Sequence, residues 1–149
     1  MDIVQSDNAS LRMVSKKIED LNMVSSIIAT ILEALGKDRK SGQLGIAAPQ
    51  IGSSIRIFGF WYGNQKIVVV NPEIILSGRE FKSIEGCLSI ARGNQKYIVI
   101  RNKFVKLRGL DANGKLISLK LNGLDAAVVQ HETDHLDGIM IDQKGIVLP

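Results

Sequence analysis

The 149-residue chain contains one cysteine, two histidines and three prolines, and only 5% of its residues are aromatic. A single cysteine excludes an internal disulfide, so nothing ties the protein to an oxidising compartment. No apolar run approaches the roughly 20 residues that a membrane-spanning helix requires, and the first ten residues lack the basic and then apolar pattern of a secretory signal. We therefore expect a cytoplasmic protein without membrane contacts, unless a cleaved organelle targeting peptide once preceded this sequence.

Charge of one sign is not concentrated in any part of the chain. The formal net charge is +4, and the basic residues form only short clusters, at Lys16–Lys17 and between Lys37 and Lys40. Because no basic stripe is interleaved with aromatic residues, the sequence does not predict a nucleic-acid partner. With 45% hydrophobic and 23% charged residues, the composition is typical of a folded globular protein. The length, without repeats or linkers, predicts a single domain over residues 1–149.

Two segments have the apolar spacing of a helix. In the first, Leu21–Leu35, apolar residues recur every three or four positions, with Asp20 as the predicted N-cap and Gly36 as the predicted stop. The second begins after Asn122, a predicted N-cap, and ends at Gly138. Both segments are apolar enough to pack against a core.

The region between these helices is predicted to be a loop followed by strands. Residues 36–43 are polar, whereas the chain from Ile55 onward is rich in alternating and β-branched residues. The turn signals Gly63-Asn64 and Asn113-Gly114 favour antiparallel hairpins. The sequence therefore predicts an α+β fold, with antiparallel sheets, one N-terminal helix and a second, central helix. The predicted strands are Ile55–Tyr62, Lys66–Asn71, Tyr97–Arg101, Phe104–Leu110 and Lys115–Leu121.

The only two histidines of the chain lie inside the second predicted helix, as His131 and His135 with Glu132 between them. Residues four apart are one helical turn apart, so both imidazoles project from the same face and can bind one metal ion. Glu132 can then reach a water molecule on the metal without being a ligand. The alternative, a chance spacing of two histidines, does not account for the glutamate.

A catalytic metal site of this type needs a third protein ligand. Zinc peptidases with this helix motif use a glutamate or histidine further downstream, but none follows His135, and Ile141 occupies the position of the metzincin histidine. The third ligand must therefore lie upstream. Cys87, in the segment EGCLS, is the candidate because a thiolate is a good ligand for zinc or ferrous iron. A lone cysteine is also often a core residue, and that alternative stays open.

Three segments resemble, in order, the motifs of the peptide deformylase family. A single short motif would be weak, but three at suitable spacing are specific, and the resemblance covers nearly the whole chain. The family's fold, antiparallel sheets around a central helix that carries the histidines, agrees with the order of elements predicted above. The segments are Leu44-Gly45-Ile46-Ala47-Ala48-Pro49-Gln50, Glu85-Gly86-Cys87-Leu88-Ser89 and Gln130-His131-Glu132-Thr133-Asp134-His135.

The resemblance implies an enzyme that removes the N-formyl group from the formyl-methionine of nascent polypeptides. One divalent metal ion, expected to be Fe²⁺ with Zn²⁺, Ni²⁺ or Co²⁺ as alternatives, would be bound by Cys87, His131 and His135. A water on this metal would attack the formyl carbon, with Glu132 as the general acid/base. The cytosol of a bacterium or of a phage-infected host is the implied location.

The resemblance also implies roles for residues around the metal. The side chain of Gln50 and the backbone N–H of Leu88 would stabilise the oxyanion. Ordinary core packing is an equal alternative for the four apolar members of the substrate-contacting set. The residues expected to contact the substrate are Leu44, Gly45, Glu85, Gly86, Leu124, Ala127 and Val128.

Three features depart from the family's pattern. The glycine that usually opens the first motif is Gln43, and the proline that often follows the second motif is Ala91. The long C-terminal helix that docks many bacterial members on the ribosome is missing, so we do not expect that mode of docking. Short forms of this kind occur among bacteriophage-encoded members.

Other interpretations stay open at this point. Asp134 is expected either to pair with Arg101 or to be a solvated charge. A deacylase or peptidase of different specificity is a rival among enzymes, and a non-catalytic module with a structural metal is a rival of another class. Structural sites usually have four protein ligands, and the chain has no further cysteine or histidine.

Overall fold

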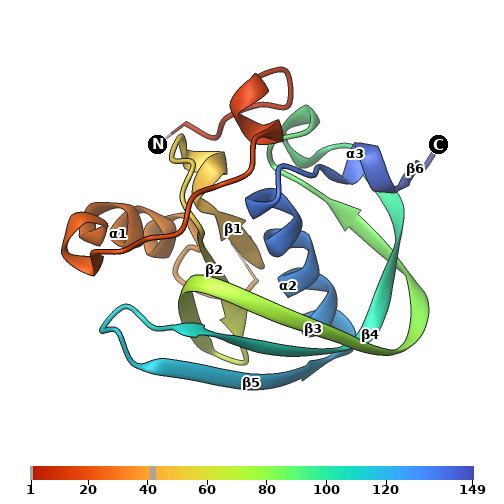
Figure 1. The fold of residues 1–149 in the computed structure, drawn as a ribbon. Helices are drawn as coiled ribbons and strands as arrows, with labels where there is room; N and C mark the ends of the chain where they lie inside the picture. The colour runs from red at the N-terminus through yellow and green to blue at the C-terminus, as the bar shows by residue number, and fades with distance from the viewer. Residues whose placement is uncertain (1, 41–42) are drawn as a thin grey trace.

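The computed structural model describes residues 2–40 and 43–149 (Figure 1). None of the described helices is long and apolar enough to cross a membrane. Residues 41 and 42 of the predicted loop lie outside the described residues. The elements in chain order are η1 (Ala9–Arg12), η2 (Leu21–Met23), α1 (Ser25–Ala34), β1 (Gly45–Ala47), η3 (Ala48–Ile51), β2 (Ile57–Tyr62), β3 (Gln65–Gly86), η4 (Ala91–Gly93), β4 (Lys96–Leu110), β5 (Leu116–Asn122), α2 (Gly123–Leu136), α3 (Ile141–Lys144) and β6 (Ile146–Val147).

The strands form one six-stranded antiparallel sheet with the order β1-β2-β3-β4-β5, and β6 pairs with β4. The α+β prediction with antiparallel pairing is confirmed, although the described strands share a single sheet rather than several. Figure 1 shows β3 and β4 curving around α2. Register shifts near Asn71 and near Gly78 interrupt the β3–β4 pairing, and such bulges bend a sheet and increase its twist.

The hairpin at Gly63-Asn64 is confirmed, since Tyr62 pairs with Gln65 across it and Gly63 has a φ of 60°. Two strand predictions were wrong in extent. The segments predicted as Tyr97–Arg101 and Phe104–Leu110 belong to one continuous strand, β4. The part of β3 after residue 71 was missed, because Asn71-Pro72 is a pair of residues that typically ends a strand.

Asn71 shows why β3 nevertheless continues. Its φ is 51°, a left-handed conformation that asparagine tolerates better than most residues. Its side chain accepts a hydrogen bond from the Ile18 N–H and donates one to the Ile18 carbonyl, both at 2.8 Å. A bulge that anchors the N-terminal segment therefore replaces the predicted end of the strand.

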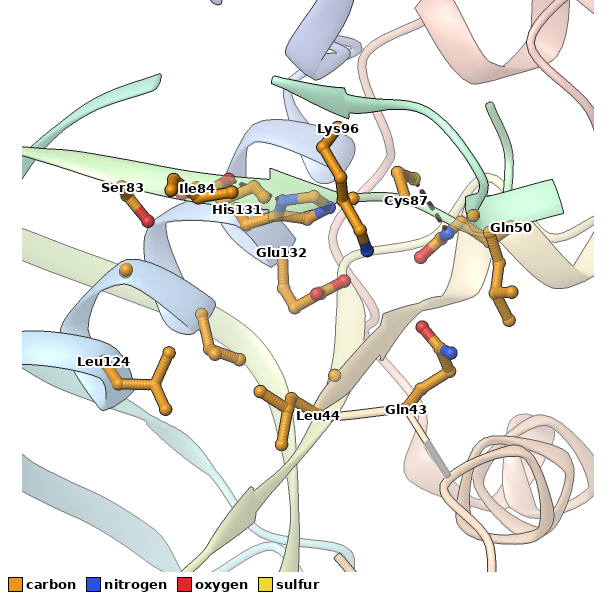
Figure 2. A pocket seen from close by; sticks show the side chains of 17 residues that line it. Gln43, Leu44, Gln50, Ser83, Ile84, Cys87, Lys96, Leu124, His131 and Glu132 are labelled. Carbon is orange, nitrogen blue, oxygen red and sulfur yellow. Dashed lines mark hydrogen bonds and ion pairs between the residues drawn. The ribbon is translucent and has the colours of Figure 1, made fainter. Parts of the chain in front are cut away.

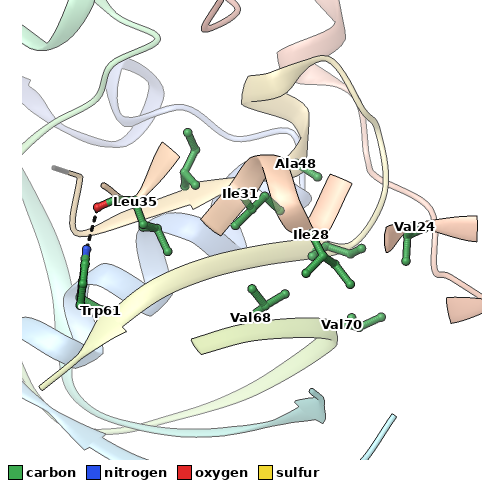
Figure 3. Close-up of a cluster of buried hydrophobic side chains, with 10 residues drawn as sticks. Val24, Ile28, Ile31, Leu35, Ala48, Trp61, Val68 and Val70 are labelled. Atoms are coloured by element: carbon green, nitrogen blue, oxygen red, sulfur yellow. Dashed lines mark hydrogen bonds between the residues drawn. The ribbon is translucent and has the colours of Figure 1, made fainter. Parts of the chain in front are cut away.

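The N-terminal helix is shorter than predicted. Asp20 caps η2, where its carboxylate accepts the Asn22 N–H at 2.9 Å, and α1 starts only at Ser25. Gly36, with a φ of 80°, follows the last turn as predicted. The apolar face of α1 packs on β2 and β3, and the Trp61 indole donates to the Leu35 carbonyl at 2.9 Å (Figure 3). Ile46 of β1 belongs to the same apolar cluster, so the packing of α1 also holds β1 in place.

Helix α2 contacts β1, β2, β3, β4 and β5 and lies in the hollow of the curved sheet (Figure 1). Asn122 occupies its N-cap position, but its side chain makes no capping hydrogen bond, contrary to the prediction. The helix ends as predicted at Gly138, whose N–H donates to His135 and whose successor Ile139 donates to Asp134. This Schellman arrangement stops the helix directly after its second histidine.

Gly138→Ala is expected to destabilise the protein more than Gly123→Ala does. Both glycines have positive φ, 74° and 59°, and this conformation alone costs a side chain about 1–2 kcal/mol. A Cβ at Gly138 would also lie 2.7 Å from the Arg12 carbonyl oxygen, whereas nothing lies within 4 Å of one at Gly123. Denaturant unfolding of both variants checks the difference, and equal losses would contradict the steric argument.

Candidate metal centre

Three donor side chains converge beside α2. His131 and His135 are one turn apart on the helix, and their ring centroids are 5.0 Å apart. Cys87 follows the end of β3, and its sulfur lies 3.4 Å from His135 Nε2. One donor atom from each of the three residues lies within 4.8 Å of the others. The long strand β3 and the helix α2 thus bring together residues that are 44 and 48 positions apart in the sequence, as the motifs predicted.

A buried ion-pair network orients His131. Glu85 Oε1 lies 2.8 Å from His131 Nδ1, so this nitrogen is held away from the cluster and Nε2 is available to it. Arg101, only 2% exposed, donates to both Glu85 oxygens at 2.9 and 2.8 Å and to Asp134 at 2.6 Å. The expected pairing of Asp134 with Arg101 is therefore present. Lys144 adds a second contact to Asp134 at 2.9 Å.

Glu85 stays ionised in this network. Burial by itself would raise the pKa of its carboxyl, but hydrogen bonds from Arg101 and His131 outweigh that effect and lower the pKa to about 2. An ionised carboxylate on one ring nitrogen strengthens the other nitrogen as a metal ligand. Glu85 is thus a partner of the cluster, in addition to lining the cavity beside it.

The donor set fits a divalent metal ion. Glu132 Oε1, next to the donors, is buried without a hydrogen-bond partner in the described chain, although buried polar atoms are rarely left unpaired. A thiolate with two imidazoles suits zinc or ferrous iron. No fourth protein ligand joins the three donors among residues 2–40 and 43–149. Three ligands and an open position are typical of a catalytic rather than a structural site.

Glu132 lies between the cluster and β1. Its side chain is only 4% exposed, and burial raises the pKa of its carboxyl to about 7. A Cβ at Gly45 would come within 2.7 Å of Glu132 Oε2. Only glycine therefore lets β1 approach the carboxylate so closely, which gives Gly45 a steric role in addition to the predicted contact with substrate.

Gln50, in η3, lies next to the cluster on the side of Cys87. Its Oε1 accepts the Ala47 N–H at 3.0 Å, which turns its amide nitrogen toward the cluster. Nε2 lies 3.5 Å from the Cys87 sulfur and 3.2 Å from Ser89 Oγ. Because both ends of the amide are held, its N–H groups have a defined direction.

A cavity of about 300 Å³ opens above Glu132 and His131 (Figure 2). Every predicted site residue lines this cavity except His135, which is fully buried. The four apolar residues whose role was open, Leu44, Leu124, Ala127 and Val128, all lie in its wall. The lining residues are Gln43, Leu44, Gly45, Gln50, Ser83, Ile84, Glu85, Gly86, Cys87, Leu88, Gly93, Lys96, Leu124, Ala127, Val128, His131 and Glu132.

Sequence reasoning missed several of these lining residues. Ser83 and Ile84 directly precede the second motif, so their proximity to it was a usable signal. Lys96 was not recognisable in this way. It lies ten residues after Gly86 and reaches the cavity because β4 returns antiparallel to β3, with Lys96 opposite Gly86.

Known proteins of one family resemble this chain. The family model of polypeptide deformylases matches residues 1–145. A peptide deformylase of Dictyoglomus turgidum is 32% identical over 147 residues, which cover 98% of this chain and 93% of the relative. The crystal structure of the Thermotoga maritima peptide deformylase has a TM-score of 0.86 at 30% identity and covers 95% of each chain. That of a probable peptide deformylase from Synechococcus phage S-SSM7 has a TM-score of 0.85 at 33% identity, covering 97% of this chain and 99% of its own.

Proposed function

This chain belongs to the peptide deformylase family, whose members remove the formyl group from nascent peptides, and we propose that it does so with one divalent metal ion held by Cys87, His131 and His135. The observation that carries this proposal is the convergence of these three donors beside the unpaired carboxylate of Glu132. Ferrous iron is the expected ion. When bound, such an ion lowers the pKa of a water molecule and polarises a carbonyl.

Glu132 acts as the general acid/base in this proposal. Its Oε1 has no partner among the described residues and is free to accept a proton from the attacking water. The same carboxyl then returns the proton to the amine that leaves when the C–N bond of the formamide breaks. Gly45 supports this role, since it leaves the carboxylate the space to move between the two groups.

Two donors would face the oxygen that gains charge. Gln50 supplies one, because its amide is held between the Ala47 N–H and Ser89. The backbone N–H of Leu88, next to Cys87, supplies the other. Preorganised donors of this kind are typically worth about 3–4 kcal/mol each in the transition state.

The substrate peptide would bind as an added strand. In the described part of the chain, β1 pairs only with β2, and β3 after residue 73 pairs only with β4. Both strands therefore present a free edge to the cavity, at Gly45 and at Glu85–Gly86, and free edges accept extended peptides. The methionine side chain would contact the apolar wall of Leu44, Leu124, Ala127 and Val128.

The direct test is hydrolysis of formyl-Met-Ala-Ser by anaerobically purified protein with measured metal content. Release of formate in proportion to bound metal, with no cleavage of acetyl-Met-Ala-Ser or of internal peptide bonds, supports the proposal. Cleavage of the acetylated peptide would favour a deacylase of broader specificity. Metal without turnover on any of these substrates would favour a non-catalytic metal module.

Val128→Trp is expected to raise KM for formyl-Met peptides at least several-fold, because an indole would fill the wall where the methionine side chain binds. Metal content should stay stoichiometric, since the two histidine donors lie further along α2 and Cys87 follows β3. Leu116→Trp is a matched control on β5, where Leu116 is exposed and outside the cavity. An unchanged KM in folded Val128→Trp protein would assign Val128 to core packing.

A further inference from the structure

Lys96 is a cation at the cavity that the proposed chemistry does not use. It is the only lysine or arginine among the described lining residues. Its ammonium makes no hydrogen bond or ion pair with any residue of the described chain. The carboxylate of Glu85, also in the lining, is already neutralised by Arg101. Lys96 therefore offers an unpaired positive charge at the cavity.

The position of Lys96 is set by the pairing of β4 with β3. Lys96 lies opposite Gly86, and a Cβ at Gly86 would meet its Nζ at 2.6 Å and its Cδ at 3.2 Å. Because glycine has no side chain, the Lys96 side chain can lie directly over Gly86. Figure 2 shows it extending over the cavity. The absence of a side chain at Gly86 is what lets the ammonium reach this place.

The two faces of β3 and β4 differ at this edge. Val99 and Arg101 are buried on the inner face, toward α2. Because side chains alternate along a strand, Lys96 and Gly86 lie on the outer face, together with Ile84. Ile84 is 69% exposed although it lines the cavity. The apolar side chain of Ile84 and the unpaired ammonium of Lys96 thus belong to the same outer face, one register position of that face apart.

A peptide added along the free edge of β3 must present alternate side chains to these two faces. This step rests on the proposed function, in which the formyl group lies near Cys87 and the methionine side chain points inward, toward α2. The side chain of the second residue then points outward, on the face of Ile84 and Lys96. The length of glutamate allows its methylenes to contact Ile84 and its carboxylate to reach the ammonium.

We propose that Lys96 makes the enzyme prefer formyl-methionyl peptides with an acidic second residue, glutamate above all. An exposed ion pair changes an equilibrium by up to about fivefold, and like charges repel to a similar extent. We therefore expect kcat/KM for a Glu peptide to exceed that for a Lys peptide by roughly fivefold or more at low ionic strength. The preference should shrink in 0.5 M NaCl, because salt screens exposed charges.

The test compares formyl-Met-Glu-Ser, formyl-Met-Gln-Ser and formyl-Met-Lys-Ser on the metal-loaded enzyme and three variants. Lys96→Met should abolish the charge preference, and Lys96→Glu should reverse it in favour of the Lys peptide. Lys82→Met is the matched control, because Lys82 is exposed on the outer face of β3 but does not line the cavity. This control should keep the wild-type preference.

Each result decides between the inference and its alternatives. Equal kcat/KM for the three peptides in the wild-type enzyme, or a preference that persists in Lys96→Met, would overturn the role of Lys96 and leave the proposed function intact. Reversal in Lys96→Glu supports it, since a merely structural lysine would not change the sign of the preference. Failure to hydrolyse any formyl peptide would overturn the proposed function and this inference with it.

Discussion

Glu132→Gln is expected to lower turnover of formyl-Met-Ala-Ser by at least about 10²–10⁴-fold, the usual contribution of a general acid/base. Glutamine keeps the size of glutamate but cannot accept a proton and return it to the leaving amine. Because Glu132 is not among the three converging donors, the variant should keep its metal. Metal content and turnover measured on one preparation check both statements, and peptide affinity should survive because the cavity wall is unchanged.

Asp125→Asn provides the matched control for this variant. It makes the same acid-to-amide change on the same helix, at a residue whose carboxylate lies 3.5 Å from Arg39 and does not line the cavity. It should turn over normally. Near-normal turnover of fully metal-loaded Glu132→Gln protein would defeat the mechanism, whereas loss of metal would make Glu132 a ligand that closes the site.

Cys87→Ala should sharply lower metal content, and turnover should fall with it. The described chain offers no other donor in this position, and two imidazoles alone form an incomplete site. The fold should persist, since the substitution removes a single sulfur atom from the small cluster around Leu11 and Val99. A loss of about 1 kcal/mol in the free energy of unfolding is the expected scale. Elemental analysis and denaturant unfolding measure the two effects.

Ser89→Ala serves as the control for Cys87→Ala. Ser89 is buried two residues away and contacts Gln50, but it is not part of the donor cluster. This variant should retain metal while losing part of its turnover, because the Gln50 amide loses one of its two anchors. Stoichiometric metal in purified Cys87→Ala protein would remove Cys87 from the ligand set.

Local patterns were sufficient for several elements of the fold. The glycine after each of the two longer helices was predictable, because Gly36 and Gly138 both adopt the positive φ that a helix end favours. The hairpin at Gly63-Asn64 follows from turn chemistry within a few residues. The helical period placed His131 and His135 on one face. These features depend on neighbours in sequence, which is why sequence reasoning reached them.

Predictions failed where distant contacts outweigh local preference. Asn71-Pro72 is typical of the end of a strand. Hydrogen bonds between Asn71 and Ile18 instead stabilise a bulge, and β3 continues to Gly86. Aspartate is a common N-cap of α-helices, but Asp20 caps the short η2 instead of α1.

The sequence by itself determined the candidate ligands and the candidate general acid/base, since their motifs are short and the chain has only one cysteine and two histidines. Only the tertiary structure decided how these groups are oriented. Glu85 holds His131 because β3 runs along α2, and Arg101 joins Glu85 to Asp134 because β4 pairs with β3. Lys96 reaches the cavity through the same pairing. Strand register joins residues that no local period connects, so these contacts exist only in the folded chain.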